Sequence, residues 1–175
     1  INLVNSYVYG YRFTGTLTGY NLGEIDNCSS VNLELINTWD YGGGLVGYNS
    51  GYIANSSSTG IVKTDDFNAG GLVGYNRNNA DQNVTAHIIN CYSEADVTYT
   101  TELDSNGYPY NLGGLVGYNS SGKVENSYAT GCVTGFEEVG GLIGENAGEI
   151  IGCYATGYVV GSSYYVGGLI GETGS

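Results

Sequence analysis

The sequence predicts an all-β chain folded as a parallel β-solenoid, also called a β-helix. Three observations support this fold: a seven-residue block returns along the chain, a second block follows each copy, and the composition of 31 Gly, 18 Tyr and 1 Pro suits closely stacked strands with tight corners. A fixed period of roughly 20–50 residues is typical of solenoids and arrays. We expect a single repeat domain over residues 1–175, with about six coils, a period near 27 residues and about three short strands per coil.

The first block, GGLVGYN, anchors the repeat. It occurs at residues 43–49, 70–76 and 113–119, and it returns as GGLIGEN at 140–146 and as GGLIGET at 167–173. A degenerate copy, GTLTGYN, lies at 15–21, and the last glycines of successive copies are 28, 27, 43, 27 and 27 residues apart. The anchor residues of the five close copies are Gly44, Leu45, Gly47, Gly71, Leu72, Gly74, Gly114, Leu115, Gly117, Gly141, Leu142, Gly144, Gly168, Leu169 and Gly171.

The second block reads as a strand with one face in a narrow core. Its central residue is a small Cys or Ser, at Ser6, Cys28, Ser56, Cys91, Ser127 and Cys153. An apolar residue stands three positions earlier in every copy, and small or apolar residues recur at alternate positions afterwards. Because side chains alternate between the two faces of a strand, these positions point inward. The three cysteines fall on alternate coils, roughly 9.6 Å apart, which is too far for a disulfide.

Asparagine marks two corners of the coil. One set stands just before the central residue, at Asn5, Asn27, Asn55, Asn90 and Asn126. The other set closes the anchor, at Asn21, Asn49, Asn76, Asn119 and Asn146, and follows a column of tyrosines, Tyr20, Tyr48, Tyr75 and Tyr118. Asparagine tolerates left-handed backbone, and stacked amides can hydrogen-bond from coil to coil, so we expect two ladders. A third corner is expected in the Gly-rich approach to the anchor.

Two regions depart from the repeat. Before about residue 40 the strand pattern breaks, with Arg12 and Glu34 at the last inward site, and we expect Phe13, Leu33 and Leu35 to take over the core. Within about residues 75–112 the long spacing contains 16 extra residues, divided evenly between two places. Insertions in solenoids form loops, often on a binding face. The aromatic and rigid residues of the second insertion are the binding candidates: Tyr99, Tyr108, Pro109 and Tyr110.

The acidic composition restricts the partners. The chain has 17 Asp and Glu against 4 Lys and Arg, a net charge of −13. This charge repels nucleic acid and anionic membrane surfaces. The apolar runs are far shorter than the roughly 20 residues that span a bilayer. We therefore expect neither a nucleic-acid partner nor a membrane span.

Reactive side chains are scattered, and we expect no catalytic residue and no enzyme activity. His87 is the only histidine and lies beside an insertion, so it is interpreted as a surface loop residue. Glu145 and Glu172 share one register a coil apart, where earlier coils carry tyrosine. Two carboxylates at this spacing are either solvated, which we favour, or bridged by calcium. No other cofactor is indicated.

Two alternatives stay open. A carbohydrate-binding or carbohydrate-active β-helix would need clustered carboxylates or basic residues on one face, whereas the acids here are scattered and the four basic residues are sparse. An ice-binding solenoid would need flat rows of threonine. The row Thr59, Thr130 and Thr156 is interrupted by Val31 and Glu94, and no second row lies parallel to it.

The anchor resembles the GLUG motif, named for Gly-Leu-any-Gly. Gly44-Leu45-Val46-Gly47 and its four close copies match that motif, whereas Thr16 replaces the first glycine of the degenerate copy. Similar repeats occur in large bacterial surface and secreted proteins, including filamentous-haemagglutinin-like adhesins and non-catalytic parts of immunoglobulin A proteases. The resemblance implies an extracellular β-solenoid in an adhesive, filament or stalk role. It implies no protease activity, because the chain has no HExxH sequence.

The expected partners are other copies of the chain, stacked end to end, and host or matrix glycans or proteins. Neither end of the sequence carries a capping helix or a charged, Pro-bearing edge. If ETGS at 172–175 ran directly into INLVNSY at 1–7, the interval from Gly171 to Ser6 would be 10 residues, against 9 or 10 within the chain. This spacing predicts an intact repeat across the joint and therefore head-to-tail assembly into fibres.

Overall fold

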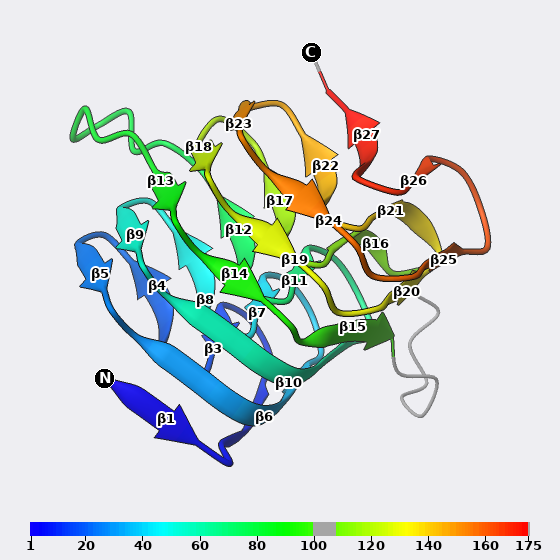
Figure 1. Cartoon of the computed structure of the whole chain (residues 1–175), viewed down its shortest axis with the longest axis horizontal. Coiled ribbons are helices and arrows are strands. Elements are labelled where there is room, and N and C mark those ends of the chain that lie inside the picture. Colours follow the sequence, from blue (N-terminus) through cyan, green and yellow to red (C-terminus); the bar gives the residue numbers. More distant parts are fainter. Residues whose placement is uncertain (100–107, 175) are drawn as a thin grey trace.

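The computed structural model describes residues 1–99 and 108–174, which form a stack of β-strands with the two termini at opposite ends (Figure 1). Every regular element in these residues is a strand, and all the strands pair in parallel in four sheets. Two of the sheets hold six strands each, one from every coil. The predicted parallel β-solenoid of about six coils with a period near 27 residues is confirmed. Each coil has four sides, one more than the three expected.

The chain passes from sheet D to A, B and C, and then enters the next coil. Sheet A contains β1 (Asn2–Val4), β2 (Tyr7–Gly10), β6 (Ser29–Asn37), β10 (Ser57–Thr64), β14 (Tyr92–Ser93), β15 (Asp96–Tyr99), β19 (Tyr128–Ala129), β20 (Val133–Gly135), β24 (Tyr154–Ala155) and β25 (Val159–Gly161). Sheet B contains β3 (Thr14–Gly15), β7 (Gly42–Gly43), β11 (Ala69–Gly70), β16 (Tyr110–Gly113), β21 (Glu137–Gly140) and β26 (Val166–Gly167).

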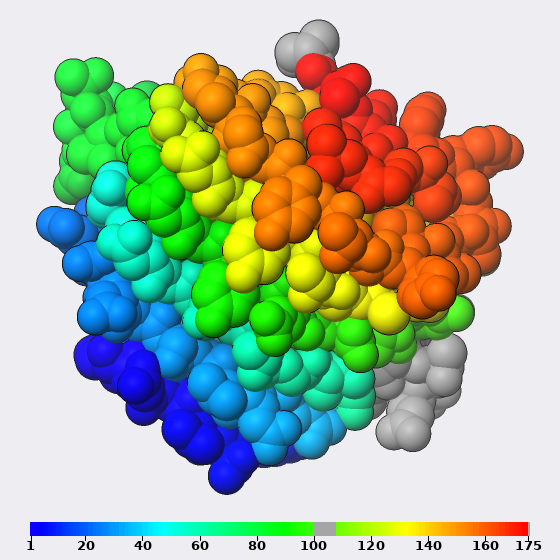
Figure 2. Space-filling model, viewed as in Figure 1, coloured from blue at the N-terminus to red at the C-terminus, as the bar shows by residue number. Residues whose placement is uncertain are grey.

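Sheets C and D complete the coil. Sheet C contains β4 (Thr18–Asn21), β8 (Val46–Asn49), β12 (Val73–Asn76), β17 (Val116–Asn119), β22 (Ile143–Asn146) and β27 (Ile170–Thr173). Sheet D contains β5 (Glu24–Asp26), β9 (Tyr52–Ala54), β13 (His87–Ile89), β18 (Lys123–Glu125) and β23 (Glu149–Ile151). Figure 2 shows the coils as successive colour bands from the blue N-terminal end to the red C-terminal end.

The anchor sequence is explained by how closely the coils approach each other. A Cβ atom on Gly44 would meet the carbonyl oxygen of Gly71 in the next coil, and one on Gly71 would meet that of Gly114. A side chain at this corner would therefore push the coils apart. The leucine that follows turns inward, and Leu45, Leu72, Leu115 and Leu142 are all 0% exposed. The anchor is thus a packing motif, with glycine for the contact between coils and leucine for the core.

The cysteines lie in the core as expected. Cys28 and Cys91 are buried, Cys153 is partly buried, and all are free thiols. The Cys91 thiol donates to the carbonyl oxygens of Ile89, at 3.2 Å, and Ile53, at 3.7 Å. Cys132 lies off the inward face and is exposed. The core column is therefore held by sulfur and hydroxyl contacts to backbone, without disulfides.

The first coil differs from its predicted register. Leu3 pairs with Ser30 and Val8 pairs with Leu35, so Ile1, and not Ser6, occupies the position of Cys28. Asn5 consequently leaves the Asn27 column. It aligns instead with Asn32, whose Nδ2 donates to Asn5 Oδ1 at 2.7 Å, and both have left-handed backbone. The Asn-Ser pair at 5–6 imitates the Asn-Cys pair at 27–28, so the sequence pattern could not separate the two alignments.

This register also corrects the predicted joint. With Ile1 in the Cys28 column, ETGS running into INLVNSY is four residues shorter than the usual interval between anchor and core column. In the inner coils, the residues by which this interval falls short belong to the segment that forms the sheet D strand. Nearby, Leu33 and Leu35 are buried as expected, and the strand pairing shifts between Ser58 and Gly60. Phe13 does not join the core, because its ring packs on tyrosines outside the coil.

The two insertions leave one coil at different corners. The first, at residues 77–86, lies between β12 and β13, at the corner of sheets C and D. The second lies between β15 and β16, at the corner of sheets A and B, and residues 100–107 of it fall outside the described part of the chain. The described ends of the two insertions therefore lie at different corners of the coil. In the described residues, no helix is long and apolar enough to cross a membrane.

Candidate functional site

A column of stacked tyrosines covers the outer face of sheet C in the first four coils. Tyr20 stacks on Tyr48 at 4.7 Å between ring centroids, Tyr48 packs on Tyr75 at 4.9 Å with the rings tilted by 42°, and Tyr75 meets Tyr118 edge-on at 5.2 Å. The strand register places these residues directly opposite one another. Partial burial raises the pKa of Tyr48 and of Tyr118. The predicted column is thus a continuous aromatic ridge, which we call the tyrosine column.

A second column lies beside the first at the corner entering sheet B. Its members all have left-handed backbone with φ between 54° and 62°: Phe13, Tyr41, Asn68, Asn111, Glu138 and Tyr165. Non-glycine residues rarely adopt this conformation, and bulky ones do so least often. Phe13 and Tyr41 stack at 5.1 Å, and Tyr41 approaches Tyr75 at 4.9 Å. Sequence reasoning placed a corner here but missed this column, because only its two asparagines are typical of left-handed backbone.

The same face becomes acidic in the last two coils. Glu145 pairs in register with Glu172, and both continue the tyrosine column. Glu138 joins them from the neighbouring column. Burial, a hydrogen bond with Glu172 and repulsion by Glu145 and Glu172 raise the pKa of Glu138 to about 7. Burial and repulsion by Glu172 also raise the pKa of Glu145. Among residues 1–99 and 108–174, no group of three or more His, Cys, Asp or Glu side chains is arranged to hold a metal ion.

The two predicted asparagine ladders use different properties of the residue. In the set that closes the anchor, each Nδ2 donates to the Oδ1 of the next coil at 2.8 to 2.9 Å, from Asn21 through Asn146. The other set, Asn27, Asn55, Asn90 and Asn126, has left-handed φ of 48° to 52°, and Gly152 continues it at 63°. The first set is therefore an amide ladder, and the second is a backbone corner.

The predicted binding aromatics of the second insertion pack against the coil beside them. Tyr108 stacks on Phe136 at 4.4 Å between centroids and stays 64% exposed, while the centroids of Tyr110 and Phe67 are 4.0 Å apart. Pro109 is buried, and its carbonyl accepts from the backbone of Phe136 at 3.3 Å. Tyr99 lies at the end of β15 and is exposed. The rings of Tyr108 and Tyr110 therefore fasten the end of the insertion to neighbouring coils.

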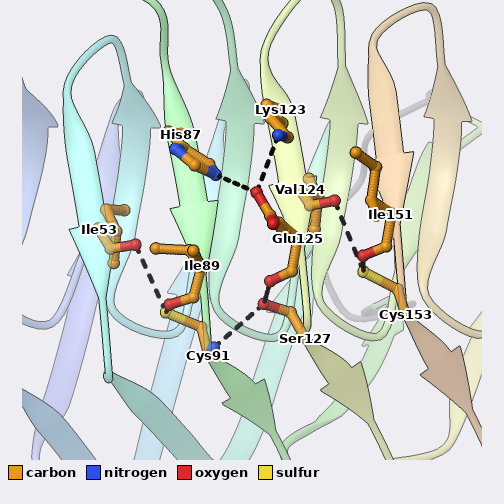
Figure 3. Close-up of polar contacts among 10 residues, drawn as sticks. All are labelled: Ile53, His87, Ile89, Cys91, Lys123, Val124, Glu125, Ser127, Ile151 and Cys153. Carbon is orange, nitrogen blue, oxygen red and sulfur yellow. Dashed lines mark hydrogen bonds and ion pairs between the residues drawn. The ribbon is translucent and has the colours of Figure 1, made fainter.

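His87 forms a charged cluster on the outside of sheet D (Figure 3). It begins β13, so the predicted loop position was wrong. Its Nε2 lies 3.3 Å from Glu125 Oε2, and Lys123 Nζ lies 2.9 Å from the same oxygen. Lys123 above all, and His87 in addition, lower the pKa of Glu125. His87 therefore joins neighbouring strands through Glu125 when it is protonated.

The nearby thiol does not complete a nucleophile–base pair with His87. His87 precedes the inward Ile88 on β13 and points outward, while Cys91 is buried in the core (Figure 3). Burial raises the pKa of Cys91 to about 11. A reactive cysteine has a lowered pKa and access to a base. Cys91 is therefore a structural thiol.

The sequence of these coils matches a known family of repeats. The model of the GLUG motif family matches residues 65–98, 108–134 and 137–160, and each range contains one anchor. The chain contains GLUG-motif repeats. The anchors outside these ranges keep the same register, since Val46 pairs with Val73 and Ile143 with Ile170. No curated protein and no solved structure matches the chain.

Proposed function

We propose that this GLUG-repeat chain is a structural and adhesive segment of an extracellular bacterial surface protein. It forms or extends a filament or stalk by stacking coils. The observation that carries this proposal is the regular stack: sheets B and C each take one strand from every coil, and the core leucines Leu45, Leu72, Leu115 and Leu142, each covered by neighbouring coils, are 0% exposed. Each coil of such a stack is stabilised by a further coil on top of it.

The strand edges support the same proposal. In the described residues, β23, β26 and β27 are the last members of sheets D, B and C, and β5, β3 and β4 are the first. Edge strands present rows of backbone donors and acceptors that can pair with another chain. We propose other copies of this chain as the partners, added end to end. Such a contact joins two different surfaces and does not close, so it yields fibres.

The register defines which strands could pair at such a joint. A second copy placed on the last coil could continue sheets A, B and C directly. Sheet D would lack one strand, because the first coil begins in sheet A. Pairing in three sheets with one strand position left open is thus the proposed geometry. The rival arrangement is a longer chain in which further residues supply the missing strand.

The adhesive part of the proposal rests on outward tyrosines. Tyr92, Tyr128 and Tyr154 stack on sheet A at 5.1 Å and 4.9 Å with their rings nearly parallel. Exposed tyrosines are common contact residues at protein interfaces. Host or matrix glycans and proteins are the proposed targets, whereas the net charge of −13 disfavours nucleic acid. In this proposal the chain has no enzymatic role.

Gly168 offers a sharp test of end-to-end stacking. A Cβ atom there meets nothing within 4 Å, whereas one on Gly141 would meet the Gly168 carbonyl oxygen of the following coil. The substitution Gly168→Val should therefore leave the single chain folded but block a stacked copy. We expect wild-type protein to sediment as growing species with rising concentration and to show rods by electron microscopy, and Gly168→Val to remain a monomer.

The matched control is Ser162→Ala in the same coil, on an exposed outward position. It should assemble like wild type. A wild-type protein that stays monomeric at high concentration would contradict end-to-end assembly. Equal assembly of wild type and Gly168→Val would contradict the proposed contact surface, since the valine side chain would then meet no neighbour.

A further inference from the structure

The first insertion is held in a fixed shape over the side of the solenoid. We call residues 77–86 the overhang; it projects from the stack in green in Figure 2. Its entry is held by Arg77 N donating to Asn49 O at 3.0 Å and by Ser50 Oγ donating to Arg77 O at 2.7 Å. Asn79 and Val84 exchange two backbone hydrogen bonds of 2.9 and 3.0 Å. The overhang is therefore a built element, with a small antiparallel turn at its tip.

The exit of the overhang is fixed as well. Ala86 N donates to Asn78 Oδ1 at 2.9 Å. Asn78 is itself held in place, because its backbone N donates to Ser121 Oγ in the next coil at 3.1 Å. Both ends of the overhang are thus tied to the coils on either side. A loop that is ordered before a ligand arrives loses less conformational entropy on binding.

A hollow of about 280 Å³ lies between the overhang and the tyrosine column. The solenoid side contributes Tyr20, Tyr48 and Ser50, and the overhang contributes Arg77, Asn78, Asn79, Ala80 and Asp81. This volume is close to the lower limit of about 300 Å³ for small-molecule sites. Tyr20 is 45% exposed, so part of its side chain is accessible to a ligand.

The polar groups around the hollow are varied and partly oriented. The Arg77 guanidinium lies close to the hydroxyls of Tyr75 and Tyr48, whose electrostatic interaction with it raises the pKa of Arg77, so this cation stands beside the tyrosine column. Asp81 supplies an acceptor, Asn78 and Asn79 supply amide groups, and the tyrosines combine a hydroxyl with an apolar ring. Donors and acceptors therefore stand beside an aromatic surface within one small space.

These groups favour one class of ligand. An apolar ligand would desolvate the arginine, the amides and the carboxylate without giving hydrogen bonds in return. An anionic ligand would meet Asp81 and a chain of net charge −13. A sugar offers neighbouring hydroxyls that both donate and accept, and its C–H face packs on an aromatic ring. We propose that the hollow binds a neutral oligosaccharide, with one or two sugar units inside it and the rest along the tyrosine column.

The test is titration of the whole chain with cellotetraose, mannotetraose and tetra-N-acetylchitotetraose, followed by NMR chemical shifts and calorimetry. We expect at least one to bind with a Kd in the millimolar range or below and to shift the resonances of Tyr20 and Asp81. Tyr20→Ala should weaken this binding by about tenfold or more, which corresponds to about 1.4 kcal/mol. Asp81→Ala should weaken it by a smaller factor.

Tyr158→Ala is the control, since Tyr158 lies just before β25, is 83% exposed, and belongs neither to the hollow nor to the tyrosine stack on sheet A. It should change the affinity by less than about twofold. Failure of all three tetrasaccharides to bind would overturn the proposal, as would equal losses in Tyr20→Ala and Tyr158→Ala. A tetragalacturonate that bound more tightly than the neutral sugars would refute the preference for a neutral ligand.

This outcome is independent of the proposed coil stacking. The hollow lies on the side of the solenoid, whereas Gly168 lies in the last coil. Gly168→Val should therefore block assembly and leave tetrasaccharide binding unchanged. Loss of binding in Gly168→Val would place the sugar at a joint between copies and would contradict a site made by the overhang of one chain.

Discussion

One face of the solenoid changes from aromatic in its first coils to acidic in its last two. Tyr20, Tyr48, Tyr75 and Tyr118 occupy the same strand position as Glu145 and Glu172. The aromatic members stack, and the acidic members repel each other. The backbone register is nevertheless continuous from Tyr118 to Glu145. The fold of each coil is therefore determined by its inward residues and corners, and the outer position is free to carry different side chains.

The last coil also differs from the others in how well its core is covered. Leu142, in the coil of Glu145, is 0% exposed like Leu45 and Leu72 in the aromatic region, whereas Leu169, in the coil of Glu172, is 39% exposed. In a solenoid each coil contacts only its neighbours, so stability is roughly a sum over coils and their interfaces. The last coil combines repulsion at Glu172 outside with incomplete packing inside. We expect it to open before the inner coils.

The largest effect should come from the core leucines. Leu72→Ala removes a fully buried side chain between two coils and should lower the free energy of unfolding by about 2–5 kcal/mol. Leu169→Ala removes a partly exposed side chain and should cost less than about half of that. Denaturant titration and hydrogen exchange would measure both. Equal losses at the two positions would show that the last coil is packed as tightly as the inner ones.

An exchange of side chains between the two regions should have an intermediate effect. Glu145→Tyr extends the tyrosine column by one ring and removes the charge that faces Glu172, so it should raise the free energy of unfolding by about 0.5–1.5 kcal/mol. Tyr118→Glu should have the opposite sign, because it removes a ring and adds a third carboxylate to the column.

The control for this exchange is Glu145→Gln, which removes the charge without adding a ring. Its stability should fall between those of wild type and Glu145→Tyr. If Gln and Tyr stabilise equally, repulsion alone accounts for the difference between the regions and ring stacking contributes nothing measurable. Thermal unfolding of the three variants at low and high salt would separate charge repulsion from ring stacking, since salt screens the charges and leaves the contact between rings unchanged.

Much of the fold could be read from the sequence because each feature obeys a local rule. The anchor glycines mark close contact between coils, and the anchor leucines mark the core. The two insertions could be placed because the interval between Gly74 and Gly117 exceeds the period. The first coil could not be aligned, since Asn5-Ser6 and Asn27-Cys28 satisfy the same pattern and only strand pairing separates them. The fourth side of the coil was missed because strands of two to four residues leave little periodic signal.

The candidate sites were harder to predict. The tyrosine column and the Glu145–Glu172 pair follow from spacing alone. Glu138 does not, because nothing in the sequence shows that the corner before sheet B lies beside the outer position of sheet C. The hollow depends on the overhang folding back toward Tyr20, two coils away, and such a path is set by tertiary hydrogen bonds. Contacts between different columns therefore could not be predicted from the spacing of residues within each column.

The smallest effect tests the acidic region by pH. The pKa of Glu138 rises to about 7 in the folded chain, from 4.5 in a solvated carboxyl group. Between these values the folded state binds more protons than the unfolded state, so stability falls as pH rises from about 4.5 to about 7 and stays low above that. Glu138→Gln should remove this contribution, and its Tm should exceed that of wild type by a few degrees above pH 7 and match it near pH 4.5. The shift is modest because solvent screens a partly exposed group.

Glu149→Gln, at an exposed position in the last coil, is the charge-matched control and should follow the wild-type curve. Parallel Tm curves for wild type and Glu138→Gln across this range would mean that Glu138 is solvated in the folded chain, and that the acidic coils are not destabilised by their own charge.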